Sequence, residues 1–422
     1  MISTYKVYCP KKILEGEITL SGSKSISNRV LLIRALCDEY FDIFNLSDSD
    51  DSVCMDSLLN SKDTVLDAHH AGTTFRFLTA YLAIQPGTQI LTGSLRMKQR
   101  PIKALVDALN LLGADIEYLE DEGYPPLKIN GPKEIWKSEI SLPANISSQY
   151  ITALLLIAPC LPLGLTIRLE GDIVSRPYIE MTLGIMAFFG VDVVFEGNTL
   201  KVPSMKYQPQ TFHVEADWSA ASYFYEIAAF SESASIKLNG LHKNSLQGDA
   251  DVAKICKKLG METLYDEYSI TLKKAKDTVY PQNLEYNFIN VPDIAQSISV
   301  LCAGIGCNVL FTGLQTLKIK ETDRISALKN EHAKMNVFFS KMPERFSSKT
   351  AIEYYMQEGT STIDNSYIPT IDTYNDHRMA MCFAPLGLLF PIVINDPLVV
   401  SKSYPGFWKD ISDLGFIISE EK

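Results

Sequence analysis

The segment Ser21–Arg29 has the residue types best suited to chemistry, and it lies between a short alternating strand pattern and an apolar helical run. It contains one glycine, several small hydroxyl side chains and two cations, Lys24 and Arg29. A helix N-terminus presents free backbone N–H groups and partial positive charge, so it favours anions. The segment therefore predicts a phosphate or carboxylate site at a strand-to-helix turn. A capped helix with chance cations is the structural alternative, and a Walker A loop is excluded because its Gly-Lys-Ser/Thr pattern is absent.

Further cations lie next to other expected helix starts. If these starts face one cleft, its lining includes Lys24, Arg29, Arg100, Lys320, Arg324, Arg378 and Lys402. Such a cleft would select a ligand with several negative charges, because Arg binds carboxylate or phosphate in a bidentate manner and Lys acts as a point charge. Each cation also has a structural alternative. Arg324 could pair with Glu321 on an exposed helix, and Arg378 or Arg100 could be solvated.

Two carboxylates lie among these cations. Asp293 follows a proline at an apolar helix start, where it could cap the helix, bind a hydroxyl group or act as a general base. Glu321 lies in the run Lys320–Arg324, whose cations favour its ionised form. In the same run, Asp323 is expected to cap a helix rather than to take part in catalysis.

The chain contains six copies of one unit, in which a strand, a capped helix and a second helix are followed by more strand. The first helices are expected to start at Ser21, Ala71, Ser147, Asp217, Asp293 and Asn375. The second helices are expected to end near Gly113, Gly190, Gly260, Asn336 and Gly415, and several have Pro at their start. After Leu59-Asn60 the chain reaches Gly72 almost at once, so the first repeat is expected to be truncated.

These repeats indicate an α/β protein of two domains with three repeats each. The expected domains are residues 21–215, which hold repeats one to three, and residues 1–20 plus 216–422, which hold repeats four to six. The N-terminal strand segment, residues 1–20, is expected to pair with the C-terminal half. A chain of 422 residues is long enough for two hydrophobic cores.

Composition narrows the classes of partner. The net charge of −11 argues against nucleic acid or an anionic membrane as a partner, and prolines interrupt both long apolar runs. No signal peptide is visible, and the eight scattered cysteines include no CxxC pair. We therefore expect a cytoplasmic protein with reduced thiols, no metal site and small anionic substrates, acting as a monomer.

The chain resembles 5-enolpyruvylshikimate-3-phosphate (EPSP) synthase, a 3-phosphoshikimate 1-carboxyvinyltransferase of the enolpyruvyl transferase family. The matching stretches span nearly the whole chain in the family's order: Ser21–Arg29, Ala71–Thr73, Arg96–Pro101, Ser147–Gln149, Lys320–Arg324 and Tyr374–Ala380. The resemblance implies two domains of three βαβαββ repeats, with helix N-termini facing an interdomain cleft. It also implies transfer of the enolpyruvyl group of phosphoenolpyruvate to the 5-hydroxyl of shikimate 3-phosphate, in chorismate and aromatic amino-acid biosynthesis, without a cofactor.

The resemblance also assigns residues to the two substrates. Shikimate 3-phosphate would be held by Lys24, Ser25, Arg29, Ser147, Ser148, Gln149, Ser175, Tyr178, Asp293 and Lys320. Phosphoenolpyruvate would be held by Lys24, Gly72, Arg100, Gln149, Arg324, Arg378 and Lys402. Asp293 would take the proton of the attacking hydroxyl, and Glu321, assisted by Lys24, would exchange protons with the methylene carbon.

The chain departs from the family pattern at three positions near these residues. His70, Phe77 and Thr316 stand where the family commonly has Asn, Pro and Asn. We therefore expect an altered phosphoenolpyruvate side, which bears on the sensitivity to glyphosate that Gly72 implies.

Two alternatives share the fold. One is UDP-N-acetylglucosamine enolpyruvyl transferase, which carries a Cys in the loop before the Arg-Pro helix, whereas residues 94–99 contain none. The other is a non-catalytic anion-binding relative, against which the intact Asp293 and Glu321 argue.

Overall fold

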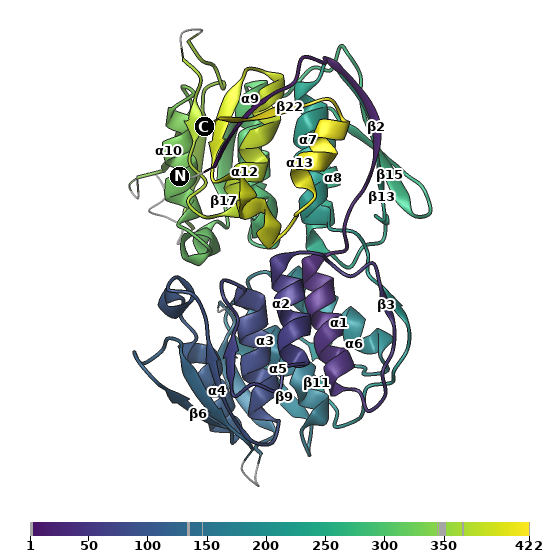
Figure 1. Ribbon diagram of the computed structural model, residues 1–422, viewed down its shortest axis with the longest axis vertical. Coiled ribbons are helices and arrows are strands. Elements are labelled where there is room, and N and C mark those ends of the chain that lie inside the picture. The colour runs from purple at the N-terminus through teal and green to yellow at the C-terminus, as the bar shows by residue number, and fades with distance from the viewer. Residues whose placement is uncertain are drawn as a thin grey trace. The chain divides into compact units, whose positions relative to one another are not determined.

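The computed structural model describes residues 3–132, 136–145, 147–343, 345, 352–364 and 367–421 (Figure 1). The chain divides into two compact units. The first, here called the N-terminal unit, is Gly22–Val214. The second, the C-terminal unit, combines Met1–Ser21 with Glu215–Lys422. Residues 1 and 2 of the expected N-terminal strand segment lie outside the described residues.

The N-terminal unit alternates strands and helices. Its helices are α1 (Lys24–Leu36), α2 (Asp50–Leu59), α3 (Gly72–Ala83), α4 (Lys103–Leu112), α5 (Ser148–Ile157) and α6 (Arg176–Phe188), with the 3-10 turns η1 (Met97–Gln99) and η2 (Ala158–Cys160). Its strands are β3 (Ile43–Phe44), β4 (Val65–Asp67), β5 (Thr88–Thr92), β6 (Asp115–Tyr118), β7 (Leu127–Asn130), β8 (Glu139–Pro143), β9 (Leu165–Glu170), β10 (Val194–Glu196), β11 (Thr199–Val202) and β12 (Phe212–His213).

The C-terminal unit follows the same alternation. Its helices are α7 (Trp218–Phe230), α8 (Val252–Lys258), α9 (Ala295–Ile305), α10 (Arg324–Ala333), α12 (His377–Phe383) and α13 (Phe407–Asp413), with η3 (Gly248–Asp251), η4 (Pro292–Ile294), η5 (Gln315–Ile319), η6 (Ala384–Leu388) and η7 (Pro397–Lys402). Its strands are β1 (Thr4–Tyr8), β2 (Ile13–Thr19), β13 (Ser233–Asn239), β14 (Glu262–Tyr265), β15 (Ser269–Lys274), β16 (Asn283–Asn287), β17 (Asn308–Thr312), β18 (Phe338–Lys341), β19 (Tyr355–Glu358), β20 (Thr370–Ile371), β21 (Ile392–Asn395) and β22 (Ile417–Glu421).

Five four-stranded sheets of the described chain share one topology. In the sheet β4-β5-β7-β6, the parallel strands β4 and β5 are joined through α3, and the antiparallel pair β6-β7 follows α4. The sheets β10-β11-β9-β8, β14-β15-β13-β2, β16-β17-β19-β18 and β20-β21-β1-β22 repeat this order. The repeats predicted from the sequence are therefore confirmed as βαβαββ units.

The N-terminal segment forms two strands rather than one, and both belong to the C-terminal unit. Strand β1 lies between β21 and β22, with Thr4 opposite Asn395 and Glu421. Strand β2 pairs in parallel with β13, where Leu14 lies opposite Ala234. The expected pairing with the C-terminal half is confirmed, and it completes the fourth and sixth repeats.

The first repeat is truncated, as predicted. Helix α2 ends at Leu59 and β4 begins at Val65, and the fully described residues between them form no strand pair. This repeat retains only the short parallel pair β12-β3, in which Phe212 lies opposite Ile43.

Three helices form the centre of each unit. In the C-terminal unit α7 packs against α9 and α12, and every residue of α7 is buried. In the N-terminal unit α1, α3 and α5 pack together (Figure 1). A helix that is apolar on all sides must be covered on all sides. The starts of these helices, which carry the polar segments found in the sequence, are thereby held by the packing of the core.

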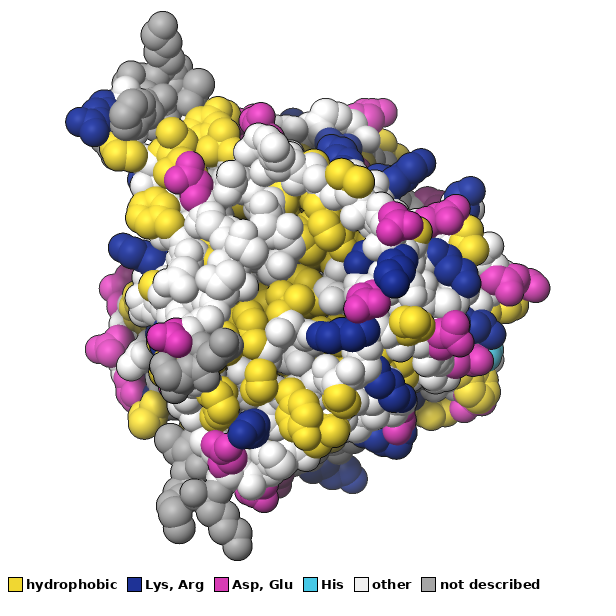
Figure 2. Space-filling model, turned by 90° about the horizontal axis from the view of Figure 1, so that it is seen from above, with side chains coloured by type: hydrophobic (Ala, Val, Ile, Leu, Met, Phe, Trp, Pro, Cys, Tyr) yellow, Lys and Arg dark blue, Asp and Glu magenta, His cyan; other side chains and the backbone are white. Residues whose placement is uncertain are grey.

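Charged side chains of both signs share the face shown in Figure 2, and the cysteines form no disulfides among the described residues. On the face shown in Figure 2, lysine and arginine side chains are interspersed with aspartate and glutamate. Among the described residues, no helix has the length and apolar character needed to cross a membrane. All eight cysteines have free thiols, and five of them are buried.

A buried histidine makes stability depend on pH. His332 is fully buried, and burial lowers its pKa to about 3. Its Nε2 lies 2.9 Å from Ser299 Oγ, which donates to Gln357 Oε1, so Nε2 carries the proton. Its Nδ1 has no hydrogen-bond partner among the described residues, so a second proton on this atom would have no acceptor for its hydrogen bond.

We therefore predict that the native protein loses stability as the pH falls from about 6.5 towards 3, because only the unfolded chain then gains a proton at His332. Relative to His332→Gln, the free energy of unfolding should fall by about 1.4 kcal/mol per pH unit in this window and should not change above it. Urea titrations of both proteins between pH 4 and pH 8 measure this difference. Parallel pH profiles would contradict the prediction.

Candidate functional site

In the C-terminal unit the site begins with a buried cap. Asp376 is fully buried, and its carboxylate accepts a hydrogen bond of 2.9 Å from the backbone N–H of Arg378 at the start of α12. The same carboxylate receives two bonds from Arg324, 2.7 Å from Nε and 3.3 Å from Nη2. This bidentate pairing joins the starts of α10 and α12.

Arg324 is buried and makes a third ionic contact. Its Nη2 donates to Glu321 Oε2 at 2.8 Å, so the exposed helix pair that the sequence allowed is wrong. Burial disfavours the charged guanidinium, but Asp376 and Glu321 outweigh this effect and raise the pKa of Arg324. Asp323 caps α10 by accepting from the N–H groups of Ile325 and Ser326, as predicted.

Asp293 lies at the centre of a group of cations. Its Oδ1 is 3.4 Å from both Lys320 Nζ and Arg324 Nη1, and its Oδ2 is 3.4 Å from Arg378 Nη2. Burial alone would raise the pKa of Asp293, but the charges of Lys320, Arg378 and Arg324 outweigh burial and lower it well below its usual range. Asp293 is therefore ionised at neutral pH.

A second carboxyl group, Asp249, belongs to this cluster and was not identified from the sequence. Ser219 Oγ donates to Asp249, and Arg378 Nη2 lies 3.4 Å from Ser219 Oγ. Burial, together with the negative charge of Asp293, raises the pKa of Asp249 to about 7.

Tyr223, whose hydroxyl lies 3.5 Å from Arg378 Nη1, was also missed. The sequence offered one signal for these two residues: their partner network includes Ser219, which lies at the fourth of the expected helix starts, the start of α7.

Lys402 lies at the end of η7, beside the residues that precede α12. Its Nζ donates to the backbone oxygen of Asn375 at 2.8 Å and to the side-chain oxygen at 2.6 Å. Together, these elements bring Asp293, Lys320, Glu321, Arg324 and Arg378 into one network, with Lys402 near the start of α12.

In the N-terminal unit, Arg29 is turned into the protein. Its guanidinium donates to Thr182 Oγ1 at 2.8 Å and to the backbone oxygens of Ser25 and Tyr178 at 2.6 and 3.2 Å. It also lies 5.7 Å from the ring centre of Phe77, the residue that departs from the family pattern. These partners are neutral, and burial lowers the pKa of Arg29 to about 10. The positive charge of Arg29 is therefore hydrogen-bonded by uncharged oxygens and is not neutralised by a carboxylate among these partners.

Gly72 and two arginines form a tight group at the start of α3. A Cβ atom at Gly72 would lie 2.5 Å from Arg100 Nη1 and 2.9 Å from Arg76 Nη1. Arg76 Nη1 also donates to the oxygen of Gly72 at 2.8 Å, and its guanidinium lies 5.5 Å from the ring centre of Tyr150. Arg100 is buried rather than part of a surface loop. The absence of a side chain at Gly72 allows this close approach, and Arg76 is a residue that the sequence reasoning missed.

The other expected residues of this unit lie at the starts of α1, α5 and α6. Lys24 Nζ lies 3.9 Å from Asp51 Oδ2, and Ser23, the N-cap of α1, makes no side-chain cap hydrogen bond. Ser147 caps α5 by accepting from the N–H of Gln149, and Gln149 Nε2 donates to Thr73 Oγ1 at 3.0 Å. Helix α5 begins at Ser148, and α6, which contains Tyr178, follows the buried Ser175 in a left-handed conformation. The expectation that all six helix starts face one cleft stays a prediction.

Comparisons with known proteins agree with this geometry. A family model described as EPSP synthase (3-phosphoshikimate 1-carboxyvinyltransferase) matches residues 9–61 and 54–411. The chain is 46% identical over 414 residues to a 3-phosphoshikimate 1-carboxyvinyltransferase of Bacteroides fragilis (strain YCH46), covering 98% of each chain. It is 37% identical over 434 residues to the protein of that name from Neisseria meningitidis serogroup B (strain MC58), covering 96% of each chain.

A solved structure supports the fold independently. The EPSP synthase from Acinetobacter baumannii matches with a TM-score of 0.79 at 20% identity, covering 100% of both chains. The fold class predicted from the sequence is confirmed. From the family model and from relatives of this identity and coverage, the chain belongs to the EPSP synthase (3-phosphoshikimate 1-carboxyvinyltransferase) family.

Proposed function

We propose that this enzyme transfers the enolpyruvyl group of phosphoenolpyruvate to the 5-hydroxyl of shikimate 3-phosphate, giving EPSP and phosphate. The observation that carries the proposal is the ionised Asp293 carboxylate, which lies within 3.4 Å of Lys320, Arg324 and Arg378. A base held among fixed cations suits a reaction in which one anionic substrate must lose a hydroxyl proton and another must be activated. The family relationship favours this reaction over the UDP-N-acetylglucosamine reaction and over a non-catalytic role.

The proposed chemistry is an addition followed by an elimination. In the addition, Asp293 takes the proton of the 5-hydroxyl and the oxygen attacks C2 of phosphoenolpyruvate. Glu321 enters this step as the protonated acid and delivers its proton to the methylene carbon. In the elimination, Glu321 takes a proton back from the resulting methyl group while the bond between C2 and the phosphate oxygen breaks. The departing phosphate takes the proton held by Asp293, so both side chains return to their starting states. The 2.8 Å contact between Glu321 and Arg324 supports this assignment, because it holds the carboxylate in one orientation.

Binding roles are proposed for the remaining residues. For shikimate 3-phosphate we assign Lys24, Ser25, Arg29, Ser147, Ser148, Gln149, Ser175, Tyr178, Asp293 and Lys320; for phosphoenolpyruvate we assign Lys24, Gly72, Arg100, Gln149, Arg324, Arg378 and Lys402, with Lys24 also assisting proton exchange. The buried charge of Arg29 and the close approach of Arg100 to Gly72 support these roles, because each places positive charge at a helix start. We further propose a cytoplasmic monomer, and the free thiols support a reducing compartment.

The first test removes the proposed base. Asp293→Asn keeps the shape of the side chain but removes its charge, and we expect kcat to fall at least about 100-fold. Phosphate release should be measured with shikimate 3-phosphate and separately with UDP-N-acetylglucosamine. Asp277→Asn, at an exposed position of the same unit, is the matched control and should keep full activity. Unchanged turnover in Asp293→Asn, or release only with the UDP sugar, would count against the proposal.

A second test uses the crowding at Gly72. Gly72→Ala would place a methyl group against the end of the Arg100 side chain, which can shift, so the protein should fold normally. We expect KM for phosphoenolpyruvate to rise about tenfold or more, equivalent to about 1.4 kcal/mol, with a smaller effect on kcat. Gly406→Ala is the control, since its added carbon has only ordinary contacts, the nearest at 3.5 Å. An unchanged KM would show that this approach of Arg100 does not matter for binding.

A third test concerns Asp249, whose pKa is raised to about 7. Above that pH, ionised Asp249 adds negative charge beside Arg378, and this charge should weaken the binding of an anion. KM for phosphoenolpyruvate should therefore rise between pH 6 and pH 8 more steeply in the native enzyme than in Asp249→Asn. The ratio of the two KM values at each pH removes the effect of the titration of the substrate itself. A ratio that stays constant across this pH range would contradict the prediction.

A further inference from the structure

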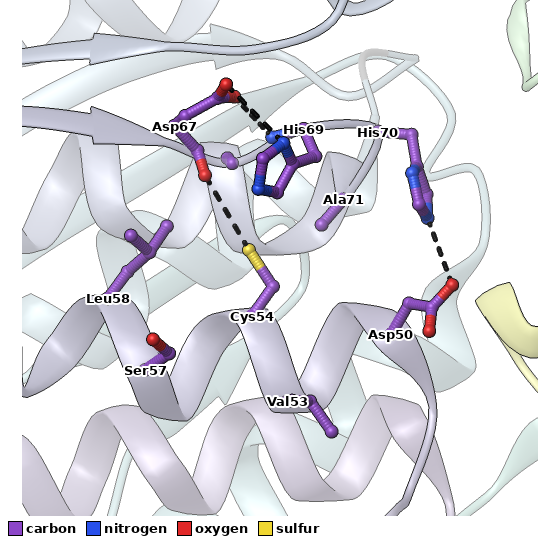
Figure 3. A pocket seen from close by; sticks show the side chains of 10 residues that line it. Asp50, Val53, Cys54, Ser57, Leu58, Asp67, His69, His70 and Ala71 are labelled. Atoms are coloured by element: carbon purple, nitrogen blue, oxygen red, sulfur yellow. Dashed lines mark hydrogen bonds and ion pairs between the residues drawn. The ribbon is translucent and has the colours of Figure 1, made fainter.

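A pocket with a volume of about 330 Å³ lies in the N-terminal unit between α2 and the loop that joins β4 to α3 (Figure 3). Helix α2 contributes Asp50, Val53, Cys54 and Leu58, the end of β4 contributes Asp67, and the loop contributes His69 and His70. None of these residues has a role in the reaction proposed above. The volume suits a small organic ligand, at the lower end of the usual range.

The pocket follows from the truncation of the first repeat. In four of the five complete repeats the second helix packs against the strand after it: α4 against β6, α8 against β14, α10 against β18 and α13 against β22. After α2 that strand is missing, because residues 60–64 run directly to β4. One side of α2 therefore keeps an open apolar wall, on which Val53 is 58% exposed.

Two carboxylates stand at the rim of this wall, each beside a histidine. Asp50 Oδ2 lies 3.6 Å from His70 Nε2, and Asp67 Oδ2 lies 3.4 Å from His69 Nδ1 (Figure 3). Both distances exceed an ordinary hydrogen bond. Because a carboxylate offers about four lone-pair sites, each can accept a donor from a ligand in addition to its present contacts.

The electrostatic field in the pocket is negative. Burial, followed by the charges of Asp51, Asp67 and Asp50, raises the pKa of the Cys54 thiol to about 12. Burial disfavours a charge of either sign, whereas the three carboxylates oppose an anionic ligand and favour a cation. A metal ion is the less suitable cation, because no three His, Cys, Asp or Glu side chains of the described residues converge as metal ligands.

We propose that this pocket binds a compact organic cation, a primary amine on an apolar group, and that its occupancy alters phosphoenolpyruvate binding at Gly72. The ammonium group would lie at Asp50, at the end of the pocket beside His70, and the apolar group would cover Val53, one turn further along α2 (Figure 3). The part of the proposal that concerns phosphoenolpyruvate rests on the proposed function, whereas the binding site itself does not.

The connection to Gly72 is short and covalent. The loop residues His69–Ala71 line the pocket and lead directly into Gly72, the first residue of α3. His69 adopts a left-handed backbone conformation, with φ of 48°, and its oxygen accepts from the N–H of Ser94 at 2.8 Å. Ser94 in turn precedes the turn η1, which Arg100 follows directly. A ligand that shifts this loop would therefore shift the partners Gly72 and Arg100.

The binding test uses phenethylamine as the probe, with phenethyl alcohol and hydrocinnamate as neutral and anionic analogues. Isothermal titration calorimetry and ligand-detected NMR on the whole protein should show saturable binding of the amine only. Asp50→Asn should weaken binding about tenfold or more, Asp67→Asn at the other end of the pocket should weaken it less, and Asp63→Asn should not weaken it. Asp63 is an exposed neighbour outside the pocket, and its substitution changes the net charge equally.

Equal binding of the alcohol or the anion would overturn the assignment of a cation, and no saturable binding of the amine would overturn the site. The kinetic test measures KM for phosphoenolpyruvate with and without saturating amine, and we expect at least a twofold change that Asp50→Asn abolishes. An unchanged KM with intact binding would overturn the effector role alone. An enzyme that binds the amine but releases no phosphate with shikimate 3-phosphate would refute the proposed function and leave the amine site standing.

Discussion

The buried guanidinium of Arg324 is the group on which the chemistry of the C-terminal unit depends. It contacts Asp376, which caps α12, Glu321, which precedes α10, and Asp293, which lies in η4. Three separate helix starts thus share one cation. Breaking such a buried pair commonly costs about 3–5 kcal/mol, because the remaining charge is left without compensation. The positions of the proposed base and of the proposed proton donor to carbon are therefore set by a structural ion pair rather than by flexible surface contacts.

This arrangement also resolves an apparent conflict about Asp293. Its pKa lies well below the usual range, which makes it a poor proton acceptor in the empty enzyme. The same three cations that lower the pKa are those proposed to bind substrate anions. When phosphate and carboxylate groups share the charge of Lys320, Arg324 and Arg378, less of it acts on Asp293 and its pKa must rise. Substrate binding would then strengthen the base at the moment when a hydroxyl is present, and the empty enzyme would keep it ionised.

Much of this organisation could be read from the sequence, and the remainder depended on contacts between distant segments. The repeats, the missing strand pair and the cap Asp323 follow local patterns of apolar spacing, Pro, Gly and capping residues. The inward orientation of Arg29 and the role of Asp249 follow no local pattern. Arg29 points inward because Thr182 and the oxygen of Tyr178, both on α6, receive its hydrogen bonds. Asp249 gains its raised pKa from burial and from Asp293, which lies in another repeat, so a helix-start motif alone could not reveal it.

The truncated first repeat raises the question of whether such a chain can still support catalysis, and the contacts of Arg29 argue that it can. Its partners come from α1 itself, from α6 and from Phe77 of α3. None of these elements belongs to the position that the missing strand pair would occupy after α2. Helix α1 is held by packing against α3 and α5 at the centre of the unit, so loss of outer strands leaves its start in place. The deletion therefore acts on the outside of α2, where it opens a pocket, while the residues assigned to the substrates keep their supports.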